Sequence, residues 1–424
     1  MSDIEEIIDG LGVIGLRKYV RTALTIAGSD SGGGAGIEAD LKTFSAFGVH
    51  GLVAVTSVTA QNTKEVTAIH DIPPEVVRRQ IEAVADDIGV DAAKTGMLSN
   101  KGIIKAVSKT VKRYGFPLVV DPVMIAKSGA PLLREDAVDA LIEHILPLSK
   151  LVTPNRYEAE KLSGIKIENL EDARKAAKAI AEGFGAEAVI VKGGHLGLSE
   201  AVDVLYHDGR FREYRAPFIE GCTHGTGCSF SAAITANLAR GEPLEEALRT
   251  AKKFITIGIE YGARIGRGHC PVNQNAWIEI PAERWRVYSR LKTISGKFKT
   301  LTPKIAEYLP ESGVNFVYAL PALYARSKND IAVWISDGNV EFGASDGSIL
   351  EIMRYYPELR SALVLKYDRG VIRRAHDRGF IVLEHNRGEK TPDLICRDNL
   401  LFVMGKTPEE VLEKMEELLL KTSF

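Results

Sequence analysis

Four consecutive residues, Gly225-Thr226-Gly227-Cys228, combine a permissive backbone with a reactive side chain, and they open a predicted helix of small residues. Backbone N–H groups at a helix N-terminus bind anions, and glycines let that backbone approach a phosphate closely. Cys228 lies in the first predicted turn, where the helix field lowers the pKa of a thiol, so that a thiolate there could accept a proton from a substrate hydroxyl. Position alone leaves a second interpretation open, in which Cys228 is packed as a small hydrophobic residue.

A second glycine cluster, Gly28 to Asp40, stands between the first predicted strand and the first predicted helix. Gly34 to Ala39 fits the dinucleotide pattern G-x-G-x-x-A, but that site needs an acidic residue about 20 positions on. The next strand ends instead in Thr59-Ala60-Gln61-Asn62. A plain strand-to-helix turn remains open, and the favoured interpretation is a loop that covers a small polar ligand. The side chains that would face this ligand are Ser29, Asp30, Ser31 and Asp40.

Polar residues also follow three other predicted strands. Asp121 ends LVV, Asn155 follows KLV with Glu158 one turn later, and Lys192 ends AVIV. Ligands of open α/β sheets bind beyond the carboxyl ends of the strands. Carboxylates for magnesium, a lysine for phosphate and an anion-binding helix together indicate phosphoryl transfer.

Other chemistries find less support. Gly405-Lys406-Thr407 matches the tail of a phosphate-binding loop of the Walker A type, but Leu400 stands where its leading glycine is required. The zinc-binding pattern H-E-x-x-H is absent. The 4 cysteines include no C-x-x-C pair, which argues against a structural zinc site, and they are too few for a disulfide scaffold. We therefore expect a reduced, cytoplasmic protein, in which Cys222 has a structural role.

These residues must be positioned by an α/β fold. From Thr22 onward, continuous apolar runs alternate with amphipathic helical patterns, which is typical of a mostly parallel sheet with helices on both faces. Residues 201–219 break the alternation and predict a β-hairpin with Asp208-Gly209 at its turn.

Length and composition set the domain organisation. The 424 residues exceed the roughly 250–300 that one core supports, so we expect two domains. The alternation ends near Gly268, and the expected division is an N-terminal extension (1–20), a first domain (21–275), a linker (276–290) and a smaller α/β domain (291–424). A net charge of -2 gives no electrostatic footprint for nucleic acid or anionic lipid. We expect the binding partners to be small molecules, and neither nucleic acid nor a membrane. We also expect the chain to form a homo-oligomer.

Six segments of the first domain identify a family. They are TIAGSDSGGGAGIEADLKTFSAFGVHGLVAVTSVTAQNT, AKTGML, DPVMIAKSGAPLL, TPNRYEAEKLSG, VKGGH and THGTGCSFSAA. Together they resemble hydroxymethylpyrimidine/hydroxymethylpyrimidine-phosphate kinase, the thiamine-biosynthesis branch of the ribokinase-like superfamily, over roughly residues 20 to 275. The resemblance implies an open ribokinase-like sheet and two successive ATP-dependent phosphorylations of an aminopyrimidine alcohol.

The resemblance also assigns roles to single residues. It implies that Gln61 binds the aminopyrimidine and that the GTGC loop, Gly225 to Cys228, is the anion hole with Cys228 as the base. Lys192 and Asn155 would serve ATP, and Asp121 and Glu158 would organise Mg²⁺. The remaining residues of the implied pyrimidine pocket are Gly28, Asp40, Met97 and Val123.

The second domain resembles the archaeal-type thiamine-phosphate synthase, through AERWRVYSRLK, ALPALYARSKNDIAVWISDG, FGASDG and YPELRSAL. This implies condensation of the pyrimidine diphosphate with hydroxyethylthiazole phosphate, with Arg326 implicated in activity. The family pattern has a histidine after FGAS, whereas this chain has Gly347 there. Two alternatives stay open: a pyridoxal-type kinase in the first domain, and a non-catalytic sensor of thiamine phosphates in the second.

Overall fold

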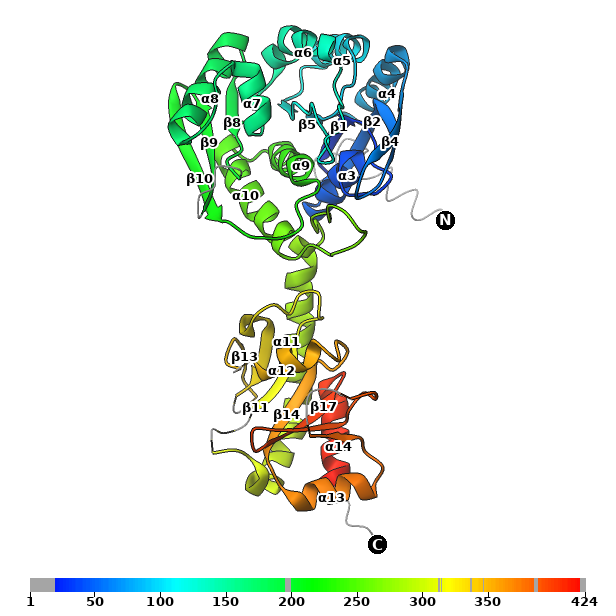
Figure 1. Ribbon diagram of the computed structural model, residues 1–424, viewed down its shortest axis with the longest axis vertical. Helices are drawn as coiled ribbons and strands as arrows, with labels where there is room; N and C mark the ends of the chain where they lie inside the picture. Colours follow the sequence, from blue (N-terminus) through cyan, green and yellow to red (C-terminus); the bar gives the residue numbers. More distant parts are fainter. Residues whose placement is uncertain are drawn as a thin grey trace, which may run out of the picture. The chain divides into compact units, whose positions relative to one another are not determined.

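The first unit is built on an eight-stranded sheet in the order β10-β9-β8-β7-β6-β5-β1-β2 (Figure 1). All neighbours from β2 to β8 pair in parallel, and β9 and β10 add an antiparallel edge. The expected mostly parallel sheet is therefore confirmed. Its strands are β1 (Thr22–Ala27), β2 (His50–Val55), β5 (Ala92–Thr95), β6 (Leu118–Val120), β7 (Leu151–Val152), β8 (Ala188–Val191), β9 (Glu200–His207) and β10 (Arg210–Pro217).

This is a computed structural model, and it describes residues 20–194, 200–311, 313, 315–335, 338–345, 347–384 and 388–419. The chain divides into a first unit that ends at Trp277 and a second that begins at Ile278. The expected N-terminal extension, apart from Val20, lies outside the described residues. No helix among the described residues is both long enough and apolar enough to cross a bilayer.

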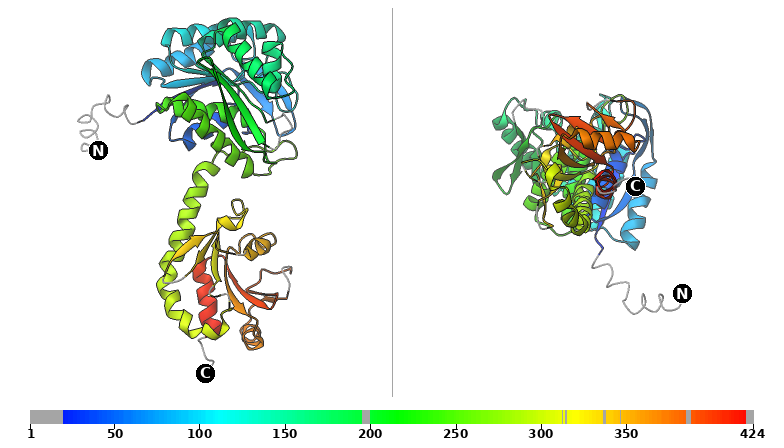
Figure 2. Two further views of the ribbon diagram at one scale, coloured as in Figure 1. Left: turned by 90° about the vertical axis from the view of Figure 1, so that its left-hand side faces the viewer. Right: turned by 90° about the horizontal axis from the view of Figure 1, so that it is seen from below.

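Helices cover both faces of the first sheet, because its strands are apolar on both sides (Figures 1 and 2). One core includes Ile81 of α4, Ile104 of α5 and Ile180 of α8. The other includes Phe44 of α3, Phe230 of α9 and Phe254 of α10. The helices are α3 (Gly36–Ala46), α4 (Pro74–Asp87), α5 (Lys101–Tyr114), α6 (Val138–His144), α7 (Arg156–Ser163), α8 (Leu170–Phe184), α9 (Thr226–Ala239) and α10 (Leu244–Glu260), with short 3₁₀ turns at η1 (Glu135–Ala137) and η2 (Leu146–Leu148).

The apolar run over residues 51–61, whose pattern is that of one buried strand, is broken at Thr56. Thr56 donates its side-chain hydroxyl to the carbonyl of Met97 (2.6 Å). After it, β3 (Ser57–Gln61) leaves the main sheet and pairs with β4 (Val66–Asp71) in a separate two-stranded sheet. Gln61 is therefore carried on a ribbon outside the main sheet. The predicted hairpin is confirmed as β9 and β10, with Asp208 and Gly209 at positive φ between them.

The second unit contains a seven-stranded sheet in the order β13-β12-β11-β14-β17-β16-β15, antiparallel except between β15 and β16. Phe298 of α11 packs against Phe316 and Trp334, with ring centroids 4.8 Å apart in both pairs. Residues 276–290, expected as a linker, form the first part of α11. The elements are α11 (Ala276–Leu301), η3 (Thr302–Lys304), η4 (Ala306–Tyr308), β11 (Asn315–Ala319), η5 (Lys328–Asp330), β12 (Ile331–Trp334), β13 (Val340–Phe342), α12 (Ser348–Met353), β14 (Ser361–Lys366), α13 (Arg369–Asp377), β15 (Val382–Leu383), β16 (Leu394–Arg397), β17 (Leu400–Gly405) and α14 (Pro408–Leu419).

Candidate active site at the carboxyl ends of the strands

The two glycine-rich loops meet backbone to backbone. Gly225 precedes α9 with a φ of 80°, and a Cβ built on it would lie 1.8 Å from the carbonyl oxygen of Gly34. Only glycine fits both this left-handed conformation and this contact. The expected helix start at the GTGC loop is confirmed, and the structure adds that the loop before α3 lies directly against it.

Asp30 holds these two loops together. Its carboxylate accepts hydrogen bonds from the backbone N–H groups of Gly32 (2.8 Å), Gly34 (3.1 Å) and Ala35 (2.8 Å), and its Oδ2 lies 2.9 Å from Nε2 of His224. The expectation that Asp30 faces a ligand is wrong, because its carboxylate is buried and engaged by the loop itself. The sequence analysis did not name His224 as a site residue. Its position directly before Gly225 was the one feature of the sequence that could have indicated such a role.

Lys192 and Asp121 meet beneath the start of α9. Nζ of Lys192 lies 3.0 Å from Oδ1 of Asp121. A Cβ built on Gly227 would lie 3.3 Å from that Nζ and 3.5 Å from Oδ2 of Asp121. The structure thus brings together two strand ends and the first turn of α9, as expected for a phosphate site in an open α/β sheet.

Asn155 and Glu158 cap α7 beside this pair. The two residues form a capping box, in which Oδ1 of Asn155 accepts from the Glu158 N–H (3.0 Å) and Oε2 of Glu158 accepts from the Asn155 N–H (2.8 Å). Burial raises the pKa of Glu158 to about 7; the charge of Asp121 adds to the rise and that of Lys192 opposes it. Two buried carboxylates balanced by one lysine fit a divalent cation. The described residues contain no group of three or more metal-ligating side chains, so a cation here would need further oxygens from phosphate or water.

Of the residues implied for the pyrimidine pocket, Gly28 and Met97 are brought together. A Cβ on Gly28 would lie 3.0 Å from Sδ of Met97. Gln61 is tied to the first glycine loop, because its N–H donates to Oγ of Ser31 (2.8 Å) and its carbonyl accepts from that hydroxyl (2.7 Å). Val123 is half-buried and follows Asp121, to whose carbonyl its N–H donates (2.8 Å).

Asp40 is enclosed by the protein. Its Oδ1 and Oδ2 lie 2.9 and 3.0 Å from Nζ of Lys94, and Oδ2 also accepts from the hydroxyl of Thr25 (2.7 Å). Both Asp40 and Lys94 have 0% of their surface exposed. Sequence reasoning did not single out Lys94 as a site residue. The sequence did offer one sign of a special role, which is a lysine in the middle of the short predicted strand DAAKTG.

Cys228 lies between the N-termini of α9 and α3, where the backbone N–H of Gly36 donates to its sulfur. Burial raises the pKa of its thiol to about 12; Asp40 and Asp121 add to the rise, and Lys94 and the Gly36 N–H oppose it. The expected lowering of this pKa is therefore wrong for the structure described here. The helix field acts on the thiol, but the loss of hydration outweighs it.

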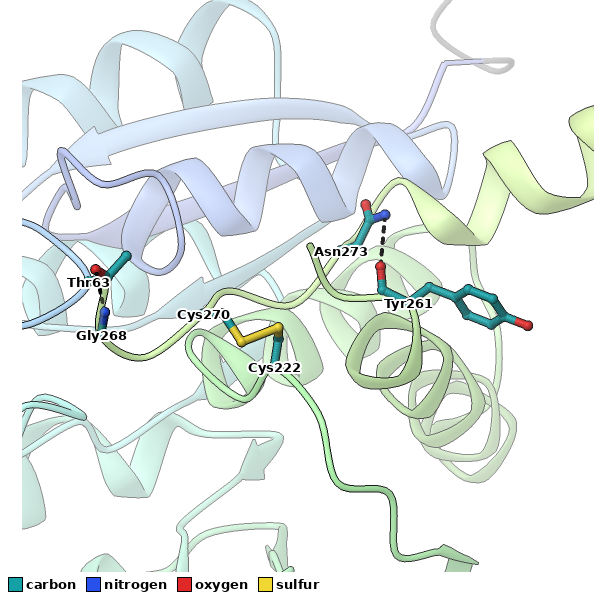
Figure 3. Close-up of a disulfide and its surroundings, with 6 residues drawn as sticks. All are labelled: Thr63, Cys222, Tyr261, Gly268, Cys270 and Asn273. Atoms are coloured by element: carbon teal, nitrogen blue, oxygen red, sulfur yellow. Dashed lines mark hydrogen bonds between the residues drawn. A yellow bond between two sulfur atoms is a disulfide. The ribbon is translucent and has the colours of Figure 1, made fainter. Parts of the chain in front are cut away.

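A disulfide joins Cys222 to Cys270, with the Cα atoms 4.8 Å apart (Figure 3). The segment before Cys270 is bound to Thr63, whose Oγ1 accepts from the Gly268 N–H (3.1 Å). The N–H of His224 donates to the carbonyl of Cys270 (3.1 Å). The expectation of reduced cysteines is thus wrong for this pair, because the fold brings together two positions 48 residues apart. Cys228 and Cys396 are free thiols.

In the second unit, Arg326 lies in a turn organised by Asp330. Oδ2 of Asp330 accepts from the backbone N–H groups of Arg326 (3.0 Å) and Ser327 (2.9 Å), which leaves the Arg326 side chain exposed. Gly347 precedes α12 with a φ of 90°. The second unit also has an open cavity of about 460 Å³, lined by Ile278, Glu279, Ala282, Glu283, Arg286 and Tyr324.

Comparison with known proteins decides the family. Residues 30–273 match the model of the phosphomethylpyrimidine kinase family. The chain belongs to the phosphomethylpyrimidine kinase family. Residues 291–400 match the thiamine-phosphate synthase ThiN family, so this kinase carries a second domain of thiamine biosynthesis. The expectations for both domains are confirmed.

Individual relatives agree with this assignment. The hydroxymethylpyrimidine/phosphomethylpyrimidine kinase of Haemophilus influenzae is 51% identical over 268 residues, which are 62% of this chain and 99% of that protein. An ADP complex of Bacillus subtilis pyridoxal kinase has a TM-score of 0.57 at 40% identity, covering 61% of this chain and 98% of the other. Clostridium difficile phosphomethylpyrimidine kinase has a TM-score of 0.51 at 46% identity, covering 56% and 98%. The expected ribokinase-like fold is confirmed, and ATP is the co-substrate of the kinase family.

Proposed function

We propose that the first unit phosphorylates 4-amino-5-hydroxymethyl-2-methylpyrimidine twice at the carboxyl ends of its strands. In the first step the hydroxymethyl oxygen attacks the γ-phosphorus of ATP, the bond to the β-phosphate oxygen breaks, and ADP leaves. In the second step a phosphate oxygen of the monophosphate attacks a second ATP. The observation that carries this proposal is the junction of Gly227, Lys192 and Asp121, which places the N–H groups of a helix start beside a lysine and a carboxylate.

Each residue of this site has its own proposed role in phosphoryl transfer. Gly225, Thr226 and Gly227 present backbone N–H groups to the transferred phosphoryl group, and Lys192 neutralises charge on the nucleotide phosphates. Asn155, joined to Lys192 by a backbone bridge, borders the nucleotide. Cys228 accepts the proton of the hydroxyl in the first step.

Gln61 recognises the ring, since an amide donates and accepts in one plane and so matches an aminopyrimidine edge. Gly28, Met97 and Val123 would surround the ring, and Asp40 would belong to the same pocket, held by its ion pair with Lys94.

Mg²⁺ is the proposed cofactor. Asp121 and Glu158 would hold it, because both are buried carboxylates, and burial together with the charge of Asp121 raises the pKa of Glu158. When bound, the cation would neutralise negative charge on the phosphates of ATP. We further propose that the working form is a homo-oligomer, which light scattering of the purified chain would test.

The second unit is proposed to condense the diphosphate with hydroxyethylthiazole phosphate, with Arg326 binding the diphosphate leaving group. A guanidinium suits this group because it donates two parallel hydrogen bonds. The second candidate for this unit is a non-catalytic sensor of thiamine phosphates, which is favoured by Gly347 at the place of the expected histidine. Condensation assayed with the purified chain, with and without the thiazole phosphate, separates the two.

The kinase proposal is tested by product analysis of Cys228→Ser. Serine does not ionise near neutrality, and a general base contributes typically about 10²–10⁴-fold. We expect the first phosphorylation to slow within that range. The second should slow much less, because the attacking phosphate oxygen is already ionised at pH 7. Mass spectrometry of the products from the alcohol and from the monophosphate, each with MgATP, measures both steps. Equal slowing of both steps would contradict the base role of Cys228.

The alternative of a pyridoxal-type kinase is tested by a competition assay, in which pyridoxal and the pyrimidine alcohol compete for phosphorylation by the purified chain.

A further inference from the structure

Cys228 presents a difficulty for the proposed chemistry. A base must lose its own proton first, and burial disfavours the thiolate. The charged groups that act on this sulfur come from four packed elements. They are Lys94 of β5, Asp40 of α3, Asp121 after β6 and Lys192 after β8, together with the N–H of Gly36 at the start of α3. Among them, Lys94 is the cation that acts most strongly on the thiol.

Lys94 occupies an unusual place for a lysine. It lies in β5, between β1 and β6 in the sheet, and none of its surface is exposed. Two residues earlier on the same face, Ala92 packs in the core shared by Phe44 of α3 and Phe230 of α9. Nζ of Lys94 lies 2.9 Å from Asp40 and 3.7 Å from a Cβ built on Gly96, so the ammonium reaches the carboxyl end of the strand.

Stability alone does not account for this ion pair. Removing two charges from water costs several kcal/mol per ion, and apolar residues of similar volume often stabilise a core as well or better. The same domain has a second buried pair, Lys252 of α10 with Asp203 of β9, in which Nζ and Oδ2 lie 2.7 Å apart. The pair Lys94–Asp40 differs from it in joining α3 to β5, both of which pack against α9, the helix whose first turn carries Cys228.

We propose that Lys94 is a positioning residue of the kinase reaction, which acts through Cys228. Its ammonium group stabilises the thiolate, while Asp40, with Oδ1 2.9 Å from Nζ, holds that ammonium in place. The proton of the substrate hydroxyl passes to Sγ as the oxygen–phosphorus bond forms, and no electron transfer is involved. This inference rests on the proposed base role of Cys228.

The test measures the reactivity of Cys228 in the full chain. Iodoacetamide reacts with the thiolate, and peptide mass spectrometry resolves Cys228 from the other cysteines. Lys94→Met should raise the apparent pKa of Cys228 and slow its alkylation at pH 8 by roughly tenfold or more, since one pKa unit is a factor of 10. Asp40→Asn should act in the opposite direction, because it removes a negative charge that disfavours the thiolate. The double variant, which leaves no unpaired buried charge, should lie between the two and remain testable if Lys94→Met does not fold.

The opposite signs separate this proposal from a merely structural role. If the pair only supports packing, both single variants loosen the site and both accelerate alkylation, which overturns the proposal. Lys252→Met is the matched control, since it breaks a buried lysine–aspartate pair elsewhere in the domain. It should leave the alkylation rate of Cys228 unchanged, and an effect as large as that of Lys94→Met overturns the proposal.

Kinase assays distinguish a failure of the inference from a failure of the proposed function. Lys94→Met should lower kcat of the first phosphorylation by about the same factor by which it slows the alkylation of Cys228. The KM for ATP should not change. If alkylation shifts as expected while kcat stays at the wild-type value, the base role of Cys228 is overturned, although the coupling between the two side chains stands. If neither changes, the coupling itself is refuted.

Discussion

Nε2 of His224 lies 2.9 Å from Oδ2 of Asp30, a residue 194 positions earlier in the chain. Both side chains are buried, and each belongs to one of the two glycine-rich loops. The contact therefore joins the loop before α3 to the loop before α9, and with it the two halves of the proposed phosphoryl-transfer site.

The first prediction concerns this contact. Burial alone would raise the pKa of Asp30, but the hydrogen bonds from His224, Ala35 and Gly32 hold it below its ordinary value. A carboxylate with a lowered pKa in the folded state stabilises the fold above its unfolded pKa, and this contribution is lost as the pH falls below about 4. His224→Asn should destabilise the first unit by about 1–3 kcal/mol at pH 7, because it weakens the hydrogen bond to the buried carboxylate of Asp30. Denaturant titrations at pH 7 and pH 3 measure this, and the difference between the proteins should narrow at pH 3.

The control for that variant is His70→Asn, at an exposed histidine of β4. It should leave stability at pH 7 within the error of the measurement. Equal stability of His224→Asn and the parent would contradict the linking role of the Asp30–His224 contact.

The disulfide provides the second prediction. A cross-link between residues 48 positions apart removes chain entropy from the unfolded state, by roughly 4 kcal/mol on the loop-entropy relation. Cys222→Ser should therefore lower the Tm of the first unit, and dithiothreitol should lower the Tm of the parent to a similar value. Scanning calorimetry with and without the reductant measures both. If dithiothreitol lowers the Tm of Cys222→Ser further, another disulfide contributes to stability.

The third prediction concerns ring recognition. Gln61→Leu keeps a similar volume but leaves the polar edge of the pyrimidine unpaired, at a cost of about 1–3 kcal/mol. We expect the KM for the pyrimidine alcohol to rise roughly ten- to a hundredfold. The KM for ATP serves as the internal control and should change little, because Gln61 lies on the β3–β4 ribbon rather than beside Lys192. An unchanged pyrimidine KM would remove Gln61 from the site.

The fourth prediction follows from Glu158, whose pKa burial raises to about 7 from 4.5. A carboxyl with a raised pKa binds its proton more tightly in the folded state, so its contribution to stability is complete below about pH 4.5 and is lost as the pH rises through 7. Glu158→Gln keeps an acceptor for the Asn155 N–H and cannot ionise. It should therefore reduce the loss of stability between pH 5 and 8, by up to about 3 kcal/mol.

Binding of MgADP gives an independent measure of the same group. A cation beside Glu158 favours the ionised carboxylate, so that binding at pH 7 should release protons. Calorimetry in two buffers of different ionisation enthalpy counts them, and Glu158→Gln should release fewer. Equal proton release by the two proteins would place the cation elsewhere.

The fifth prediction addresses the second unit. Arg326→Ala should abolish condensation or thiamine-phosphate binding without changing kinase activity, since the two units have separate cores. Gly347→Ala and Gly347→His both place a side chain at a φ of 90°, where the strain costs about 1–3 kcal/mol. If the missing imidazole limits condensation, Gly347→His should catalyse the condensation faster than Gly347→Ala, which has the same backbone strain. Equal rates would show that Gly347 is not the limiting position.

The sequence by itself determined the class of fold and the edge of the sheet at which the site lies. Buried apolar runs that alternate with amphipathic helices can satisfy their backbone hydrogen bonds and cover both faces only as a mostly parallel sheet. Because the carboxyl ends of such strands meet at one edge, Asp121 and Lys192 could be assigned to one site from their positions after LVV and AVIV. The GTGC loop could likewise be placed at a helix start from its glycines and the small residues that follow.

The tertiary structure alone decided the pairing and the electrostatics of the site. Asp30 with His224, Lys94 with Asp40, and Cys222 with Cys270 are contacts between residues far apart in the chain, and no local pattern specifies them. The pKa of Cys228 was predicted with the wrong sign, because the helix field is a property of local sequence whereas the loss of hydration depends on everything packed around the thiol. The break at Thr56 was missed for the same reason, since its hydroxyl bonds to Met97 on another strand end.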